Sequence, residues 1–293
     1  MIDLLAPLHY DFMQRAFVAA FVVGALCSGM GTYVVLRKLS FIGDGLAHAS
    51  FAGIVIAYIR GASYWSGAAI ATILTALAIG FVHRRARVSL DTAIGVLFTA
   101  AFALGIFLMS RLPRSGVDLS NYLFGDILGV GPNDLLYVVV LGVAVALVVG
   151  ALWRPLLYTS FDPVVAQAAG VRVWFSDYAL LVVLAVTIIV SVQLVGIVLV
   201  AALLVTPAAA AALLTKRFVR MMLLSGAFGI VSSVGGLYAS WWLRASSGAT
   251  IVLSATLLFF AALAISAARG RAPRGTGRRA RLAMRDVERD DLF

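Results

Sequence analysis

The chain has 293 residues, of which 62% are hydrophobic and 12% are charged, and its mean hydropathy is +1.04. A soluble globular domain is roughly 45–50% apolar and about 25% charged, so this composition excludes a soluble protein and indicates one that lies largely in lipid. The net charge of +10, from 23 Lys and Arg against 13 Asp and Glu, raises the question of which side of the membrane the cations occupy. The single cysteine, Cys27, excludes a disulfide framework and a zinc–cysteine cluster.

Nine segments of the chain are apolar over about 20 residues, the length that a helix needs to cross ~30 Å of hydrocarbon. In chain order they are 14–36, 41–59, 64–82, 92–110, 134–153, 178–195, 196–214, 219–243 and 249–268. We therefore expect an all-α polytopic membrane protein with nine spans, or eight if one segment is re-entrant. The first segment follows no basic region and no cleavage motif, which favours a retained span over a signal peptide.

The sixth and seventh segments form one apolar run of 37 residues, 178–214. A single helix of that length would be about 55 Å long, which is too long for one crossing. Ser191, Gln193 and Gly196 provide polar or flexible positions in the run. We therefore predict that the helix breaks near these residues.

The Lys and Arg residues are shared unequally between alternate loops. With nine spans and the N-terminus outside, 18 of the 23 lie on the inner side and 5 on the outer side. The inner set is Arg37, Lys38, Arg84, Arg85, Arg87, Arg154, Arg172, Lys216, Arg217, Arg220 and eight arginines in 269–293; the outer set is Arg15, Arg60, Arg111, Arg114 and Arg244. Since short cytoplasmic loops carry an excess of cations, this split predicts an outer N-terminus and a cytoplasmic C-terminus.

The composition changes at residue 269. We expect residues 1–268 to form a transmembrane domain and residues 269–293 to be a disordered, Arg-rich cytoplasmic tail. The tail arginines are expected to hold the chain at anionic lipid, each contributing about 1 kcal/mol. Nucleic acid is not an expected partner, because no aromatic side chain is interleaved with these arginines to stack on bases.

Asp44 is the one acid among 13 that lies well inside a predicted span, and His48 is the one histidine that does. Four residues apart on a helix, the two side chains project from the same face, one turn apart. Ionisable groups inside a membrane are costly and indicate function, and a carboxylate with an imidazole suits a borderline divalent cation. The alternatives are a mutually satisfied polar pair and a proton relay, although the other spans supply no further relay groups.

A metal shell of four to six ligands cannot be completed by two side chains. A symmetric homodimer would bring two Asp44 and two His48 side chains to one axis and supply four ligands. If the pair serves metal passage, the sequence therefore predicts a second copy of the chain as a partner.

The chain contains no nucleotide-binding loop. Its two lysines, Lys38 and Lys216, do not follow glycine as the phosphate-binding lysine of a P-loop does. We therefore expect the chain to be no enzyme and to hydrolyse no ATP by itself. It is either a passive or ion-coupled carrier, or it works with a separate ATPase.

Residues 161–170, between the fifth and sixth spans, have the pattern of a short capped helix. Asp162 suits the N-cap, Pro163 the first helical position and Gly170 the left-handed residue beyond the end. With Phe161 and Val164 among its apolar contacts, this helix fits a groove on a soluble partner. The alternative is a helix that lies on the lipid surface.

The sequence around Asp44, residues 36–49, resembles the signature of the membrane-spanning permease subunits of manganese-, zinc- and iron-type ABC importers. Further similarity lies in residues 91–95, 123–128, 161–170, 195–199, 204–209 and 246–253. The resemblance extends in order over residues 14–268. It implies the fold of a type II ABC importer permease in the inner, plasma membrane of a prokaryote.

The resemblance also implies a mechanism and a set of partners. Two copies would form the pathway, two cytoplasmic ATPase subunits would dock on the 161–170 helices, and an extracytoplasmic binding protein would deliver Mn²⁺, Zn²⁺ or Fe²⁺. Asp44 and His48 match the metal-coordinating pair of the family. The metal would be the transported substrate and no permanent cofactor, and residues 91–95 are more similar to the manganese branch than to the zinc branch. A proton-coupled carrier that needs no ATPase is the alternative function.

Further predictions concern three places in the chain. Thr206 and Pro207 lie inside a span, where proline removes a backbone hydrogen bond and predicts a kink, either static or mobile. His9 and residues 124–126 lie on the predicted outer side, where they could contact the binding protein.

Overall fold

The computed structural model describes residues 6–111 and 127–270, and within them it contains helices, turns and loops but no strand. Nine of the described helices are long and apolar enough to cross a membrane. They are α1 (Asp11–Leu36), α2 (Ile42–Arg60), α3 (Tyr64–Ala86), α4 (Leu90–Ser110), α6 (Pro132–Ala151), α9 (Val173–Val195), α10 (Ile197–Leu214), α11 (Phe218–Leu243) and α12 (Ser247–Ala268). The predicted all-α membrane fold is confirmed.

Four shorter elements complete the described chain. Two are 3-10 turns, η1 (Ala6–His9) and η2 (Ile127–Gly129), and two are short α-helices, α7 (Trp153–Phe161) and α8 (Pro163–Ala168). The last span ends at Ala268, where the composition changes, and residues 271–293 of the predicted tail lie outside the described residues.

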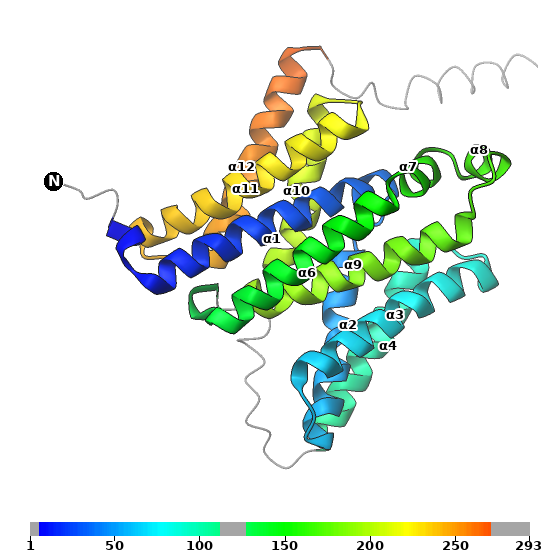
Figure 1. Cartoon of the computed structure of the whole chain (residues 1–293), viewed down its shortest axis with the longest axis horizontal. Helices are drawn as coiled ribbons and strands as arrows, with labels where there is room; N and C mark the ends of the chain where they lie inside the picture. Colours follow the sequence, from blue (N-terminus) through cyan, green and yellow to red (C-terminus); the bar gives the residue numbers. More distant parts are fainter. Residues whose placement is uncertain (1–5, 112–126, 271–293) are drawn as a thin grey trace, which may run out of the picture.

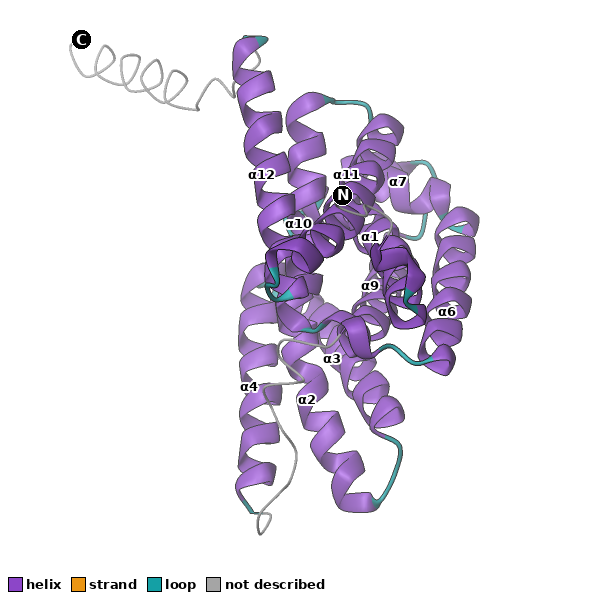
Figure 2. Ribbon diagram, turned by 90° about the vertical axis from the view of Figure 1, so that its left-hand side faces the viewer, coloured by secondary structure: helices purple, strands orange, loops and turns teal. Residues whose placement is uncertain are grey.

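The spans are arranged as a central group with one group on each side (Figure 1). α1, α6 and α9 lie in the middle. α10 and α11 pack on α1, with α12 packed against them, and the α2–α4 group lies on the opposite side, mainly through the contact of α3 with α9. Figure 2, turned by 90°, shows α12 and the α2–α4 group extending in opposite directions from this centre. α2 is the least apolar of the nine spans, yet it is mostly buried, so the helix that carries Asp44 is largely shielded from lipid.

The predicted break in the 178–214 run occurs at Gly196. α9 ends at Val195 and α10 begins at Ile197, so one residue reverses the direction of the chain. Gly196 has φ 81° and ψ 166°, a backbone conformation that is almost confined to glycine because it has no Cβ. The two-span prediction is therefore confirmed, and glycine provides the break while Ser191 and Gln193 stay inside α9.

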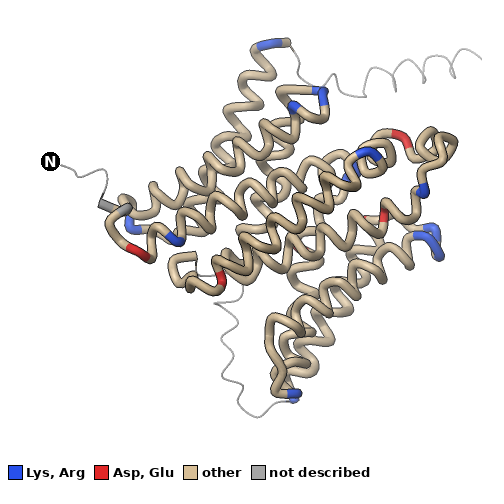
Figure 3. The backbone as a smooth tube through the Cα atoms, viewed as in Figure 1, with Lys and Arg blue, Asp and Glu red and all other residues tan. Residues whose placement is uncertain are grey.

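The described cations gather at one end of the helix bundle, which we call the basic end (Figure 3). From the ends of the helices at which they occur, this set is Arg37, Lys38, Arg84, Arg85, Arg87, Arg154, Arg172, Lys216, Arg217, Arg220 and Arg269, whereas Arg15, Arg60, Arg111 and Arg244 lie at the opposite ends of their helices. Within residues 6–111 and 127–270, the fold thus brings together the cations that the loop count assigned to the inner side.

α1 and α11 cross so closely that their backbones approach at a pair of glycines. A β-carbon on Gly24 would lie 2.8 Å from the carbonyl oxygen of Gly229, and one on Gly229 would collide with the carbonyl of Gly24 and the hydroxyl of Ser28. Small residues at helix crossings let membrane helices gain van der Waals contact where no hydrophobic force drives association. This crossing fixes α11 against α1.

We predict that Gly229→Ala destabilises the protein, because the added methyl group meets backbone that cannot move aside. Overpacking of this kind costs about 1–3 kcal/mol, which should lower the midpoint of thermal unfolding in detergent. Gly226→Ala in the same helix is the matched control, since a β-carbon there meets nothing within 4 Å. Equal midpoints for the two variants would contradict the close crossing.

Candidate metal site

Asp44 lies in the first turn of α2, but that turn begins deep inside the bundle. A β-carbon on the preceding Gly43 would lie 3.0 Å from Cδ2 of Leu204 and 3.6 Å from Cα of Ala201. Both of these residues are near the middle of α10, which ends at Leu214. Asp44 is therefore placed beside the middle of a neighbouring span, although it is only the third residue of its own helix.

Asp44 and His48 lie against each other on one face of α2. Nδ1 of His48 is 2.9 Å from the backbone carbonyl oxygen of Asp44 and 3.3 Å from its Oδ1. A proton on Nδ1 would be donated to that carbonyl, and this tautomer leaves the lone pair of Nε2 free to bind a metal. The side chain of Asp44 remains 45% exposed and that of His48 21% exposed, so both can reach a ligand.

α4 closes one side of the pair. The ring of His48 meets Phe102 edge-on at 5.1 Å between centroids and lies 6.1 Å from the ring of Phe98. A β-carbon on Gly45 would lie 2.9 Å from Cγ2 of Ile94, so the absence of a side chain at this position lets α4 approach the site. These aromatic rings fix the imidazole and exclude water from one side of it.

Asp44 and His48 can provide only part of the coordination shell of a divalent cation. Among the described residues, no group of three or more His, Cys, Asp or Glu side chains could hold a metal ion. Asp44 and His48 thus supply one carboxylate and one imidazole, two ligands of the four to six that a transition metal takes. The remaining ligands have to come from outside these residues, from another chain, or from water.

The predicted short helix at 161–170 forms α8. Oδ1 of Asp162 accepts hydrogen bonds from the backbone N–H groups of Val164 at 2.9 Å and Val165 at 3.0 Å, as an N-cap does. Pro163 is the first helical residue, and Gly170 beyond the C-terminus has φ 82°. Val164 in α8 is 76% exposed and Phe161, the last residue of α7, is 58% exposed, so this segment presents apolar side chains at the basic end.

Pro207 lies inside α10, directly after Thr206, and the carbonyl that it leaves without a helical donor is hydrogen-bonded from another helix. Because proline has no N–H, the carbonyl of Leu203 one turn earlier lacks its helical donor. The hydroxyl of Ser28 in α1 donates to this carbonyl at 3.0 Å, and the carbonyl of Ser28 accepts in turn from the hydroxyl of Ser225 in α11. The proline therefore serves as a point of attachment between three helices.

One cluster of acidic and basic side chains was not predicted from the sequence. Asp177 lies within α9, which begins five residues before the predicted span, and its carboxylate contacts Arg37 at 2.7 Å and Arg84 at 3.5 Å. The predicted span began at residue 178, so Asp177 fell just outside it, whereas α9 includes it. Arg37 was counted only as an orientation signal.

The remaining expectations concern the end opposite the basic end. His9 is exposed in η1, a position open to a partner. Residues 124–126 lie outside the described residues.

A helical bundle with one acid–histidine pair recessed beside the middle of a span, and a capped apolar helix at one end, is the architecture of a membrane transport protein. Residues 9–266 match the model of the ABC 3 transport family. The chain belongs to this family and is a multi-pass permease of the ABC type.

Individual proteins are also similar to most of the chain. The chain is 44% identical over 263 residues to the "Manganese transport system membrane protein MntC" of Halalkalibacterium halodurans, covering 90% of each chain. It is 35% identical to the "Probable iron transport system membrane protein" of Haemophilus influenzae, covering 90% of this chain and 97% of that one. Among solved structures it is similar to "PsaBC from Streptococcus pneumoniae in complex with Fab", with a TM-score of 0.78, 34% identity, and coverage of 89% of this chain and 95% of that one.

We predict that Ser28→Ala destabilises the bundle by about 1–3 kcal/mol, because it leaves the buried carbonyl of Leu203 without a donor. The measurement is thermal unfolding in detergent. Thr187→Val is the control, since the buried hydroxyl of Thr187 donates to Val183 in its own helix, whose carbonyl also has a helical donor. Equal losses for the two variants would show that the hydroxyl of Ser28 has no special role at the proline.

Proposed function

We propose that the chain is the membrane subunit of an ATP-driven importer that carries a divalent transition metal, with Mn²⁺ as the first candidate. The observation that supports this proposal most directly is the recessed Asp44–His48 pair, with a half-exposed carboxylate and an imidazole whose Nε2 is free. Family membership and the manganese-transport name of a relative at 44% identity support the cargo.

A second copy of the chain completes the metal site in this proposal. One chain contributes a single carboxylate and a single imidazole, and a twofold axis through the exposed face of Asp44 doubles both. Two Asp44 and two His48 side chains then form a four-ligand site of hard and borderline donors, which Mn²⁺, Fe²⁺ and Zn²⁺ all accept. The cation is the transported substrate of this site and no permanent cofactor.

Transport then requires energy that this chain does not supply. In the absence of a P-loop, hydrolysis belongs to two separate cytoplasmic ATPase subunits, and the chain itself is no enzyme. α8 is their docking element, since it is a capped helix with an exposed Val164 at the basic end, and the exposed Phe161 at the end of α7 directly precedes its cap. A binding protein delivers the metal at the opposite end, and nucleotide-driven rocking of the helices opens the site inward.

The orientation follows from the cations. The basic end faces the cytoplasm of a prokaryotic cell and the N-terminus lies outside the plasma membrane, as positive-inside insertion requires. Residues 1–268 form the transmembrane domain, and the Arg-rich tail from 269 onward lies in the cytoplasm near anionic lipid.

We predict that Asp44→Asn and His48→Ala each abolish Mn²⁺ uptake while the complex still assembles, because each removes one ligand per subunit. Uptake of radiolabelled Mn²⁺ is measured in proteoliposomes that contain the permease, its ATPase and its binding protein. Stimulation of ATP hydrolysis by Mn²⁺, Fe²⁺ and Zn²⁺ in the same preparation identifies the cargo.

Asp91→Asn is the matched control for the metal site, because Asp91 is also an acid in the first turn of a span but is exposed in α4. Near-normal uptake by both site variants would indicate that Asp44 and His48 have a structural role and do not bind the metal. Metal uptake by the wild-type chain without ATP would favour the proton-coupled carrier instead.

We predict that Asp162→Ala weakens binding of the ATPase subunits, because α8 loses an N-cap worth about 0.5–2 kcal/mol. Asp162→Asn keeps a side-chain acceptor and should retain most of the binding. Co-purification of the ATPase with each variant, at equal permease yield, measures the effect. Equal recovery with Asp162→Ala and wild type would argue against α8 as the docking element.

The orientation gives a labelling prediction in intact bacterial cells. In a Cys27→Ser background, Ala245→Cys at the outer end should react with a membrane-impermeant maleimide. Ala86→Cys at the basic end should react only after permeabilisation; both alanines are exposed. The reverse pattern would place the basic end outside.

A further inference from the structure

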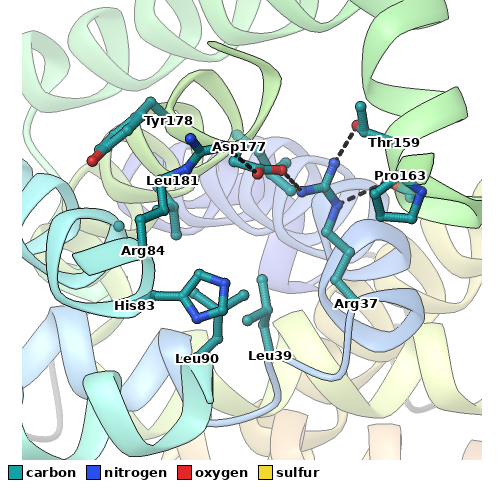
Figure 4. A pocket seen from close by; sticks show the side chains of 13 residues that line it. Arg37, Leu39, His83, Arg84, Leu90, Thr159, Pro163, Asp177, Tyr178 and Leu181 are labelled. Carbon is teal, nitrogen blue, oxygen red and sulfur yellow. Dashed lines mark hydrogen bonds and ion pairs between the residues drawn. The ribbon is translucent and has the colours of Figure 1, made fainter. Parts of the chain in front are cut away.

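Arg37 joins three helices at the basic end (Figure 4). It directly follows α1, and its guanidinium donates to Oδ1 of Asp177 in α9 at 2.7 Å and to the hydroxyl of Ser160 in α7 at 2.9 Å. It also donates to the hydroxyl of Thr159. The planar, forked guanidinium can make these bonds at once, which the single ammonium of lysine cannot match in geometry.

The charges in this cluster compensate each other. The side chain of Arg37 is only 11% exposed, and the carboxylate of Asp177 is shared with Arg84 of α3 at 3.5 Å. Removing one partner of this part-buried cluster leaves the other charge without its compensation. The cluster therefore constrains the relative positions of α1, α3, α7 and α9.

On one side, Arg37 is tied to the segment that leads into α8. Thr159 and Ser160 are in the last turn of α7, and Asp162, which caps α8, follows within two residues. A displacement of α8 by a docked partner therefore moves the hydroxyl groups that hold the guanidinium.

On the other side, Arg37 is tied to the turn that leads into α2. This turn is short and closed by backbone hydrogen bonds, from the N–H of Leu39 to Val34 at 2.8 Å and from the N–H of Ile42 to Leu39 at 2.9 Å. Leu39 and Ile42 are buried, and Asp44 is two residues beyond Ile42. A displacement of Arg37 therefore moves the first turn of α2 and the carboxylate in it.

A cavity beside the cluster gives these side chains room to move. It has a volume of about 260 Å³ and is lined by Arg37, Asp177 and Arg84 together with His83, Leu90 and Tyr178. In Figure 4 the guanidinium of Arg37 points toward Asp177 and Thr159, while His83 and Leu90 lie nearer Arg84. A fully packed cluster would resist displacement, whereas this one borders free space.

We infer that Arg37 is a positioning residue that transmits movement of α8 to Asp44, so that the state of the ATPase sets the geometry of the metal site. This inference rests on the proposed function. The alternative is a static ion pair that only holds the helices together.

A positioning role and a static ion pair predict different transport stoichiometries. The measured quantity is the ratio of Mn²⁺ transported to ATP hydrolysed by the assembled complex in proteoliposomes. Arg37→Gln and Asp177→Asn should assemble and hydrolyse ATP, but the ratio should fall by about 5–150-fold, the range of typical coupling energies. Arg37→Lys should give an intermediate ratio, because it keeps the charge but loses the fork. Arg85→Gln, an exposed arginine at the same end, is the control with the same change of charge and should keep the wild-type ratio.

An unchanged ratio in Arg37→Gln and Asp177→Asn would overturn the inference, whether or not the yield of complex falls. If these variants do not assemble, the double variant Thr159→Val and Ser160→Ala decides, since it removes two acceptors of Arg37 and no charge. Its ratio should fall in the same way, and a wild-type ratio would contradict the inference. Failure of the proposed function would give a different result from failure of this inference, because the wild-type protein would then show no ATP-dependent Mn²⁺ uptake.

Discussion

The contact between the first turn of α2 and the middle of α10 is the constraint on which the site depends. Gly43 lies against Leu204 and Ala201, so α2 begins inside the bundle and carries Asp44 to the depth of a neighbouring span. A β-carbon at this position would require the side chain of Leu204 to give by a few tenths of an ångström. The helix with the polar pair can be less apolar than the other spans because its neighbours, and not lipid, cover most of it.

The low-dielectric surroundings of the membrane spans explain how polar groups hold the bundle together. Backbone carbonyls in lipid need a donor, and the one released by Pro207 receives it from Ser28 on another helix. The charge of Arg37 is paired with Asp177 on α9. Each of these groups is costly alone and stabilising when paired, so together they specify which helices are neighbours.

In our proposal, movement of α8 and the geometry of the metal site are coupled. Asp44 and His48 are an incomplete site, and an incomplete site is suited to transport because it can be completed and opened by relative movement of two subunits. α8 is the exposed element at the basic end, and the Arg37 cluster lies between the two. Affinity for the metal and docking of the ATPase then depend on the same small set of hydrogen bonds.

The sequence by itself determined the features that depend on local pattern. Apolar runs of span length gave all nine described spans, Gly196 gave the break, and the cap pattern around Asp162 gave α8. Hydropathy misjudged the start of α9, because Asp177 lowers the hydropathy at that end of the helix although its carboxylate is paired with Arg37; Asp177 was therefore left just outside the predicted span. Spacing alone also put Asp44 and His48 on one face, although their role as metal ligands stays a prediction.

Only the tertiary structure decided what those residues touch. It placed Ser28 on the carbonyl released by Pro207, Arg37 between α7 and α9, and the first turn of α2 beside the middle of α10. The partners in these contacts are separated by more than 100 residues in the sequence, and none of them alters the period or hydropathy of its own helix. Periodicity reports which face of a helix is apolar, whereas the depth at which that helix begins is set by the backbone approach that its neighbours allow.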